Sequence, residues 1–135
     1  MEILSSRVLL RPRDLEASRA FYRDVLGLAV AREFGPPEHR GTVFFLGNGL
    51  LEVSGGRSGE AGDDAADGAA QLWLQVRDVD ATQRELRQKG VRIEREVRRE
   101  FWGLIEMWIV DPDGVPIVFV QIPDDHPLRV DQRGL

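Results

Sequence analysis

The side chains that most often carry out chemistry are scarce in this sequence. It has no cysteine and two histidines, His39 and His126, each beside prolines in a segment typical of a loop. Without cysteine, a thiolate nucleophile, a thiolate metal site and a disulfide are all excluded. We expect both histidines to have surface positions rather than to bind a metal. The sequence also shows no Ser-His-Asp arrangement and no Gly-rich phosphate loop.

Tryptophans and a few polar groups occupy alternate positions of the predicted strands. Strand side chains alternate between the two faces of a sheet, and the all-apolar set belongs against a helix. The other set then lies on the open face, away from the helix. Its main members are Arg7, Phe44, Leu46, Glu52, Gln71, Trp73, Glu106, Trp108 and Val118. Apolar walls with a few polar groups are typical of a small-molecule pocket. A second core or a dimer interface is the equally weighted alternative, because a half-sheet must bury its open face on something.

A sequence repeat supplies the elements that position these residues. Residues 7–28 resemble residues 71–91, with Asp14 aligned to Asp78 at an offset of 64 (78 − 14). Each copy has an apolar strand, an Arg-Asp turn, a helix, a glycine and a second strand. Two copies of this length indicate a supersecondary unit used twice, because a solenoid needs three or more repeats.

The first module, residues 5–54, is predicted to have the order βαβββ. Asp14 is a suitable N-cap for its helix, and Gly27 is a suitable C-terminal stop. The Gly47-Asn48-Gly49 segment predicts a hairpin whose loop has two or three residues. The predicted strands are Val8–Leu10, Leu28–Phe34, Thr42–Leu46 and Leu50–Val53.

The second module, residues 69–121, repeats this order after a Gly-, Ser-, Asp- and Ala-rich linker at residues 55–68. A helix is predicted from the Asp78 cap to Lys89, followed by strands at residues 91–97, 104–110 and 116–120. The Asp111–Gly114 segment has proline and glycine where a turn requires them. Arginine and glutamate alternate around residues 92–100, which predicts a solvent-facing strand. Residues 122–135 are predicted to form a surface arm.

The bulk properties limit the function classes. The 135 residues suit a single domain, and the net charge of −5 argues against nucleic acid or an anionic membrane as a partner. We see no signal peptide and no transmembrane segment, so we expect a cytoplasmic protein.

Three segments together resemble the vicinal oxygen chelate superfamily, which includes glyoxalase I, bleomycin-resistance proteins and extradiol dioxygenases. They are RDLEASRAFYRDVLGL, VRDVDATQRELRQKGV and FWGLIEMWIVDPDGVPIVFV. The resemblance covers residues 5–121 and implies an α+β fold. Two βαβββ modules would curve into a half-barrel cup, commonly paired in a homodimer. The motifs specify the fold rather than the reaction, because one fold hosts many functions.

The resemblance also implies a divalent metal, held by His, Glu or Gln side chains from the first and last strands of each module. The four corresponding positions here are Arg7, Glu52, Gln71 and Val118. Arginine stays protonated and valine has no lone pair, so only two donors remain. We therefore predict that the metal is absent, and that Arg7 forms an ion pair with Glu52 in its place. The family also often places a tryptophan at the mouth of the cup, and here this position is Trp102; an aromatic plug beside the turn is its alternative.

Three functional hypotheses follow. The first is a metal-free binding protein of the bleomycin-resistance type, whose ligand is an aromatic or cationic, antibiotic-like small molecule. Its tryptophans would stack on the ligand, and Glu52 and Glu106 would meet a positive charge. The second is a lyase, isomerase or dioxygenase that uses Glu52 as base with Arg7, or a metal held by displaced ligands. The third is a purely structural dimer. The role of His126 is left open.

Overall fold

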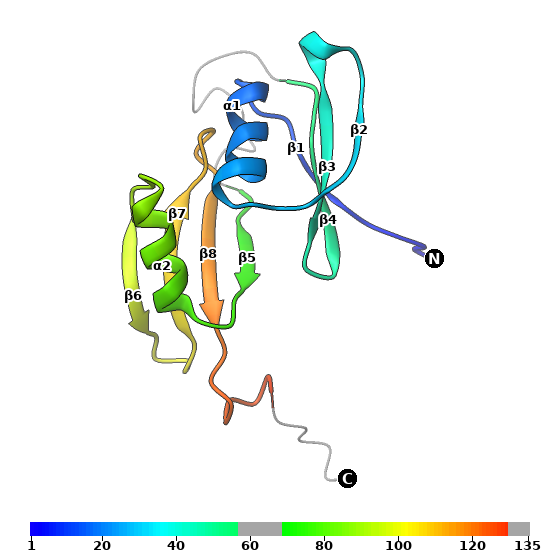
Figure 1. The fold of residues 1–135 in the computed structure, drawn as a ribbon. Coiled ribbons are helices and arrows are strands. Elements are labelled where there is room, and N and C mark those ends of the chain that lie inside the picture. The colour runs from blue at the N-terminus through cyan, green and yellow to red at the C-terminus, as the bar shows by residue number, and fades with distance from the viewer. Residues whose placement is uncertain (57–68, 130–135) are drawn as a thin grey trace. The chain divides into compact units, whose positions relative to one another are not determined.

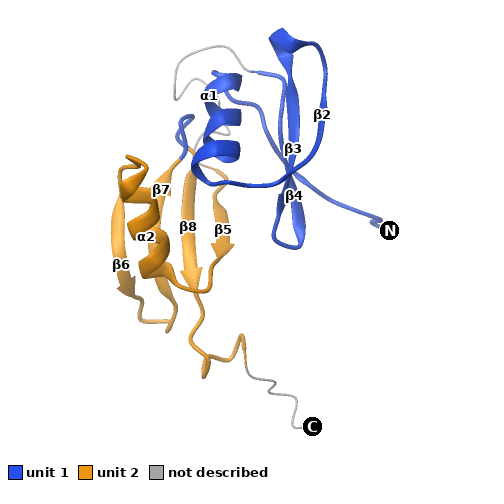
Figure 2. Ribbon diagram, in the orientation of Figure 1, with its two compact units in different colours: residues 1–67, 111–114 blue, residues 68–110, 115–135 orange. Residues whose placement is uncertain are grey.

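The computed structural model describes residues 1–56 and 69–129, so most of the predicted linker lies outside the described residues. The chain divides into two compact units (Figure 2). Unit 1 contains residues 1–67 together with the turn at 111–114, and unit 2 contains residues 68–110 and 115–135. Each unit has one four-stranded mixed sheet and the order βαβββ, so the α+β fold is confirmed.

Unit 1 has the strand order β1-β4-β3-β2, with β1 and β4 parallel and the other pairs antiparallel (Figure 1). The elements in chain order are β1 (Val8–Leu10), α1 (Leu15–Ala20), the π-helical turn η1 (Phe21–Val25), β2 (Val30–Phe34), the 3-10 turn η2 (Pro37–His39), β3 (Gly41–Leu46) and β4 (Gly49–Val53). His39 is exposed in η2.

Unit 2 has the corresponding order β5-β8-β7-β6, again with one parallel pair, β5 and β8. Its elements are β5 (Leu72–Gln75), α2 (Val79–Gln88), β6 (Arg95–Arg99), β7 (Ile105–Val110) and β8 (Pro116–Gln121). The predicted strand at residues 91–97 is shifted in the structure, because β6 begins at Arg95. A register irregularity between Arg95 and Arg98 interrupts the alternation on which that prediction relied.

Both main helices begin with the same cap, as the repeat predicts. The Asp14 carboxylate accepts from the Ala17 backbone N–H at 3.0 Å, and the Asp78 carboxylate accepts from Ala81 at 3.0 Å. Each bond satisfies one of the free N–H groups of a first helical turn. In unit 1 the helix widens at Phe21 and ends at Val25, and Gly27 follows the cap residue Leu26 with a φ of +71° that favours glycine.

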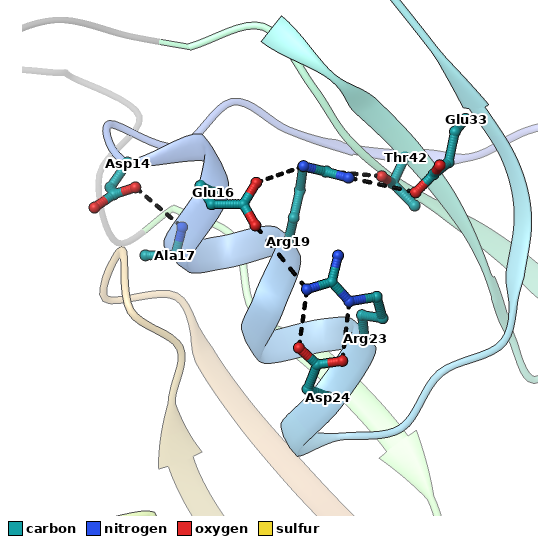
Figure 3. Close-up of polar contacts among 8 residues, drawn as sticks. All are labelled: Asp14, Glu16, Ala17, Arg19, Arg23, Asp24, Glu33 and Thr42. Carbon is teal, nitrogen blue, oxygen red and sulfur yellow. Dashed lines mark hydrogen bonds and ion pairs between the residues drawn. The ribbon is translucent and has the colours of Figure 1, made fainter. Parts of the chain in front are cut away.

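A buried arginine joins the first helix to its sheet (Figure 3). The Arg19 guanidinium donates to Thr42 Oγ1 at 2.9 Å, to Glu16 at 2.5 Å and to Glu33 at 3.3 Å. Burying this charge is tolerable because the guanidinium has acceptors on both α1 and the sheet. The network fixes the helix over the face of β3 that carries Thr42.

The core of unit 1 lies between that helix and the sheet. Tyr22, Phe44 and Leu51 are fully buried, and the rings of Tyr22 and Phe44 lie 6.4 Å apart. The Tyr22 hydroxyl donates to Asp111 Oδ2 at 2.6 Å, within the same unit. Burial, reinforced by the Asp111 charge, raises the pKa of Tyr22. In the described part of the chain, no helix has the length and apolar character needed to cross a bilayer.

Candidate functional site

The open face of unit 1, which is the sheet face opposite α1, contains the ion pair predicted from the sequence. Arg7 donates to Glu52 Oε1 at 2.9 Å, and Ser54 Oγ donates to Glu52 Oε2 at 2.6 Å. These two hydrogen bonds, chiefly that from Ser54, hold the pKa of the Glu52 carboxyl below its usual range. Glu52 is therefore a satisfied carboxylate and a poor proton acceptor.

Two residues expected on this open face lie on the other face. The β3–β4 loop is the two-residue Gly47-Asn48, so Phe44 pairs with Leu51 and Leu46 pairs with Gly49. Paired residues share a face, and Leu51 is a core residue. The placement of Phe44 and Leu46 on the open face was therefore wrong. A one-residue change of register moves every side chain of a strand to the opposite face.

The residues of β3 that share a face with Glu52 are Val43 and Phe45, which the sequence interpretation missed. Val43 pairs with Glu52, and Phe45 pairs with Leu50. Phe45 is 54% exposed, whereas its neighbour Phe44 is fully buried. The signal that could have found them was the two-residue form of the loop, which the Gly-Asn-Gly sequence allowed but did not require.

The open face of unit 2, opposite α2, has the residues that the alternation predicted. In register across the sheet lie Trp73 of β5, Val118 of β8, Trp108 of β7 and Arg95 of β6. Trp108 packs against a small buried cluster that includes Val118, while Trp73 is 50% exposed. Gln71 is exposed just before β5. The row therefore contains two indole rings, the aliphatic side chain of Val118 and the guanidinium of Arg95.

A second row on this face is polar and internally paired. Glu106 lies beside Val120 in register and is buried. Its Oε2 accepts from the Trp102 indole N–H at 2.9 Å, and its Oε1 lies 3.8 Å from the Arg95 guanidinium. Trp102 is thus joined to the open face by its N–H, while its ring is 44% exposed.

Arg95 and Glu100 are site residues that the sequence interpretation missed, because they were assigned to a solvent-facing strand. The Arg95 guanidinium is hydrogen-bonded to buried Glu100 and lies 5.7 Å from the centroid of the Trp108 ring. Glu100 also accepts from Arg98 Nε at 3.0 Å. The irregularity between Arg95 and Arg98 concealed this from a count of alternating residues.

The C-terminal arm contacts the loop that contains Trp102. His126 Nε2 lies 3.0 Å from the Trp102 carbonyl, and its Nδ1 accepts from the Leu128 N–H at 3.1 Å. The ring therefore donates through Nε2 and accepts through Nδ1. The arm was expected on the surface, and most of its described residues, up to residue 129, are exposed.

Comparison with known proteins decides the family. A sequence model of the Glyoxalase/Bleomycin resistance protein/Dioxygenase superfamily matches residues 5–119. The chain belongs to this superfamily. It is 30% identical to a lactoylglutathione lyase of Haemophilus influenzae, covering 90% of this chain and 93% of that protein. It is 29% identical to the mitochondrial methylmalonyl-CoA epimerase of Bos taurus, covering 82% of this chain and 62% of that protein.

Two solved structures share the fold. The crystal structure of SMU.1112c matches with a TM-score of 0.71 and 28% identity, covering 89% of this chain and 98% of that one. A lactoylglutathione lyase from Agrobacterium tumefaciens matches with a TM-score of 0.61 at 23% identity, covering 85% and 90%, which shows the fold alone.

The superfamily's metal positions in this chain do not fit a metal ion. In unit 1, Arg7 is a cation with no lone pair, and it and Ser54 occupy both oxygens of Glu52. In unit 2, Val118 offers only methyl groups, which leaves Gln71 as the single donor. Among the described residues, no group of three or more His, Asp or Glu side chains could hold a metal. The donor set of each unit is therefore inadequate for a stable metal centre.

Proposed function

We propose that this chain is a metal-free small-molecule-binding protein of the superfamily, and that its ligand is a planar, aromatic, antibiotic-like compound. The observation that supports this most directly is the Arg7–Glu52 ion pair. It puts a guanidinium where a metal ligand belongs, and it removes the carboxylate as a donor. A binding protein loses nothing by this change, because sequestration requires no reaction.

The indoles on the open face of unit 2 supply the contact surface for such a ligand. Trp73 is half exposed, and Trp108 rests on an aliphatic cluster that keeps its ring in place. Aromatic rings that stack or meet edge to face gain free energy beyond the area they bury, and a rigid indole loses little entropy on binding. The ligand class that best suits this surface is planar and aromatic.

The cationic version of the ligand has less support. A cationic ligand would need the carboxylates of Glu52 and Glu106 to be available to pair with its positive charge. Each already accepts hydrogen bonds, Glu52 from Arg7 and Ser54, and Glu106 from Trp102. A ligand cation would have to replace these internal partners before it gained anything.

Tryptophan fluorescence tests this proposal directly. The purified chain is titrated with cationic glycopeptide antibiotics and with neutral aromatic ones, and each titration is repeated with Trp73→Phe and Trp108→Phe. We expect saturable quenching by aromatic compounds, weakened in both variants. The matched control is Phe101→Leu, because Phe101 is 96% exposed and lies outside the sheet strands. No change in fluorescence across the panel would contradict the proposal.

An enzyme is the second candidate, and the names of the curated relatives favour it. These are lactoylglutathione lyases and methylmalonyl-CoA epimerases at about 30% identity. The version with Glu52 as general base is weakened by the lowered pKa of that carboxyl, because such a group holds an abstracted proton poorly.

Elemental analysis and two assays separate the candidates. Inductively coupled plasma analysis after dialysis against nickel or zinc should find no stoichiometric metal. Lactoylglutathione lyase and methylmalonyl-CoA epimerase assays should give background rates. One bound divalent ion per chain, or turnover that is lost in Glu52→Gln, would favour the enzyme instead.

A further inference from the structure

Two hydrogen-bond donors on the open face of unit 2 are buried without an acceptor among the described residues. They are the indole Nε1 of Trp108 and the guanidinium Nε of Arg95. The two residues face each other across the β6–β7 pair, and the Arg95 guanidinium carbon is 5.7 Å from the Trp108 ring centroid. A buried N–H without an acceptor costs free energy, so an unsatisfied donor that persists in a folded protein requires an explanation.

The acceptors near these donors are already in use. Glu100 accepts from Arg95 and from Arg98, and Glu106 accepts from Trp102. The cluster contains two guanidinium groups, those of Arg95 and Arg98, and two carboxylates, those of Glu100 and Glu106. It therefore has no net charge. The surplus is therefore in N–H donors, and the group missing from the cluster is an acceptor.

We infer that Trp108 and Arg95 form a subsite for a carbonyl or carboxylate group at the edge of a planar ligand. This inference rests on the proposed function and specifies the ligand chemistry of the same face. The acceptor would receive the Trp108 indole N–H and the Arg95 Nε–H, while the ring system of the ligand contacts exposed Trp73 in the same row.

The exposure of Arg95 gives a route to the subsite. Its side chain is 38% exposed, although its Nε and the Trp108 N–H lie beneath the surface. On this proposal the ligand group enters beside the exposed part of the Arg95 side chain, whose hydrogen bond to Glu100 leaves its Nε–H unused. Trp102 has a different role, because its N–H is already committed to Glu106.

Three probes with one ring system and different edge groups test the inference. They are 2-naphthoate, 2-naphthamide and 2-(aminomethyl)naphthalene, which present a carboxylate, a neutral carbonyl and a cation. Binding is followed by the indole N–H signals of the three tryptophans in proton–nitrogen NMR spectra. We expect naphthoate and naphthamide to bind about tenfold more tightly than the amine. A ratio of this size is the contribution to binding of about one good hydrogen bond.

The NMR signals also locate the contact. The Trp108 N–H should shift downfield with naphthoate, while that of Trp102 stays in place. Trp108→Phe keeps a ring but removes one of the two donors, so it should weaken the preference for the acceptor probes. Trp73→Phe is the matched control, and it should weaken all three probes while the preference is kept.

The outcomes separate this inference from the proposed function. Binding of all three probes with equal affinity, or a preference that is unchanged in Trp108→Phe, would overturn the acceptor subsite and leave a planar-ligand protein standing. Spectra unchanged by every probe, together with silence across the antibiotic panel, would overturn both.

Discussion

Glu52 has both carboxylate oxygens occupied, one by Arg7 and one by Ser54. The residue stands at a position where the superfamily places a metal donor, and here its charge is neutralised from within the chain. A carboxylate stabilised in this way differs from a catalytic base, because its environment favours the ionised form.

This arrangement predicts a pH-dependent contribution to stability. Because the pKa of Glu52 is lowered in the folded state, its stabilisation is fully present above the ordinary value of 4.5. It is lost as pH falls through the folded pKa. Chemical unfolding should therefore show Glu52→Gln less stable than the native chain by about 1 kcal/mol at neutral pH. The gap should be narrower in acid, below that ordinary value, than at neutral pH.

The control for this measurement is Glu38→Gln, which removes the same charge at an exposed position in η2. Its stability difference should be small at both pH values. If the difference in unfolding free energy between Glu52→Gln and the native chain is the same in acid as at neutral pH, the charge of the Glu52 carboxylate does not contribute to stability.

Tyr22 gives a second prediction at the residue scale. Its buried hydroxyl donates to the buried Asp111 carboxylate at 2.6 Å. Tyr22→Phe keeps the ring but removes one donor from a carboxylate that also accepts from the Asp113 backbone N–H, which should cost about 1.5–3 kcal/mol in the free energy of unfolding. Urea denaturation measures this loss. In a double-mutant cycle with Asp111→Asn, additive losses would mean that the two groups do not interact.

At the scale of elements, the β3–β4 hairpin decides which residues form the core of unit 1. Its two-residue loop pairs Phe44 with Leu51, next to Tyr22. The neighbouring Phe45 has the opposite orientation and is 54% exposed. Two consecutive phenylalanines therefore have different roles because of the loop length alone.

This register predicts unequal effects of the same substitution at adjacent positions. Phe44→Ala should destabilise the chain by about 3–5 kcal/mol, because it leaves a cavity between the helix and the sheet. Phe45→Ala serves as the matched control and should change stability by about 0.5 kcal/mol. Thermal or urea unfolding of both variants provides the measurement. Equal losses, or a larger loss for Phe45→Ala, would indicate the alternative register.

At the scale of the whole molecule, exposed apolar side chains remain on both open faces. Leu9 and Phe45 in unit 1 and Trp73 in unit 2 are each at least 50% exposed. Large apolar groups left in water are candidates for ligand or subunit contact. Since the superfamily resemblance implies paired chains, we propose a homodimer.

The predicted dimer has a mass of 30.4 kDa (2 × 15.2 kDa). Light scattering coupled to size-exclusion chromatography should give this value over a wide range of concentrations. Phe45→Glu and the surface control Glu38→Gln test whether the unit 1 open face takes part. A mass of one chain at every concentration would contradict the dimer.

Much of this protein could be predicted from the sequence by itself. The repeat located two βαβββ units, and the aligned aspartates located both helix caps. Alternation assigned the open face of unit 2, and the side-chain types at positions 7 and 52 predicted an ion pair rather than a metal donor set. These features depend on local propensities and on residue chemistry, which a sequence displays directly.

Only the tertiary structure decided how neighbouring strands are aligned. Strand alternation has a period of two, so one residue more or less in a loop or bulge exchanges the faces. The Gly-Asn-Gly segment allowed two loop lengths, and the irregularity in β6 hid the position of Arg95 over Trp108. The unpartnered donors followed from that placement, because hydrogen-bond satisfaction depends on atoms that are distant in the chain and adjacent only after folding.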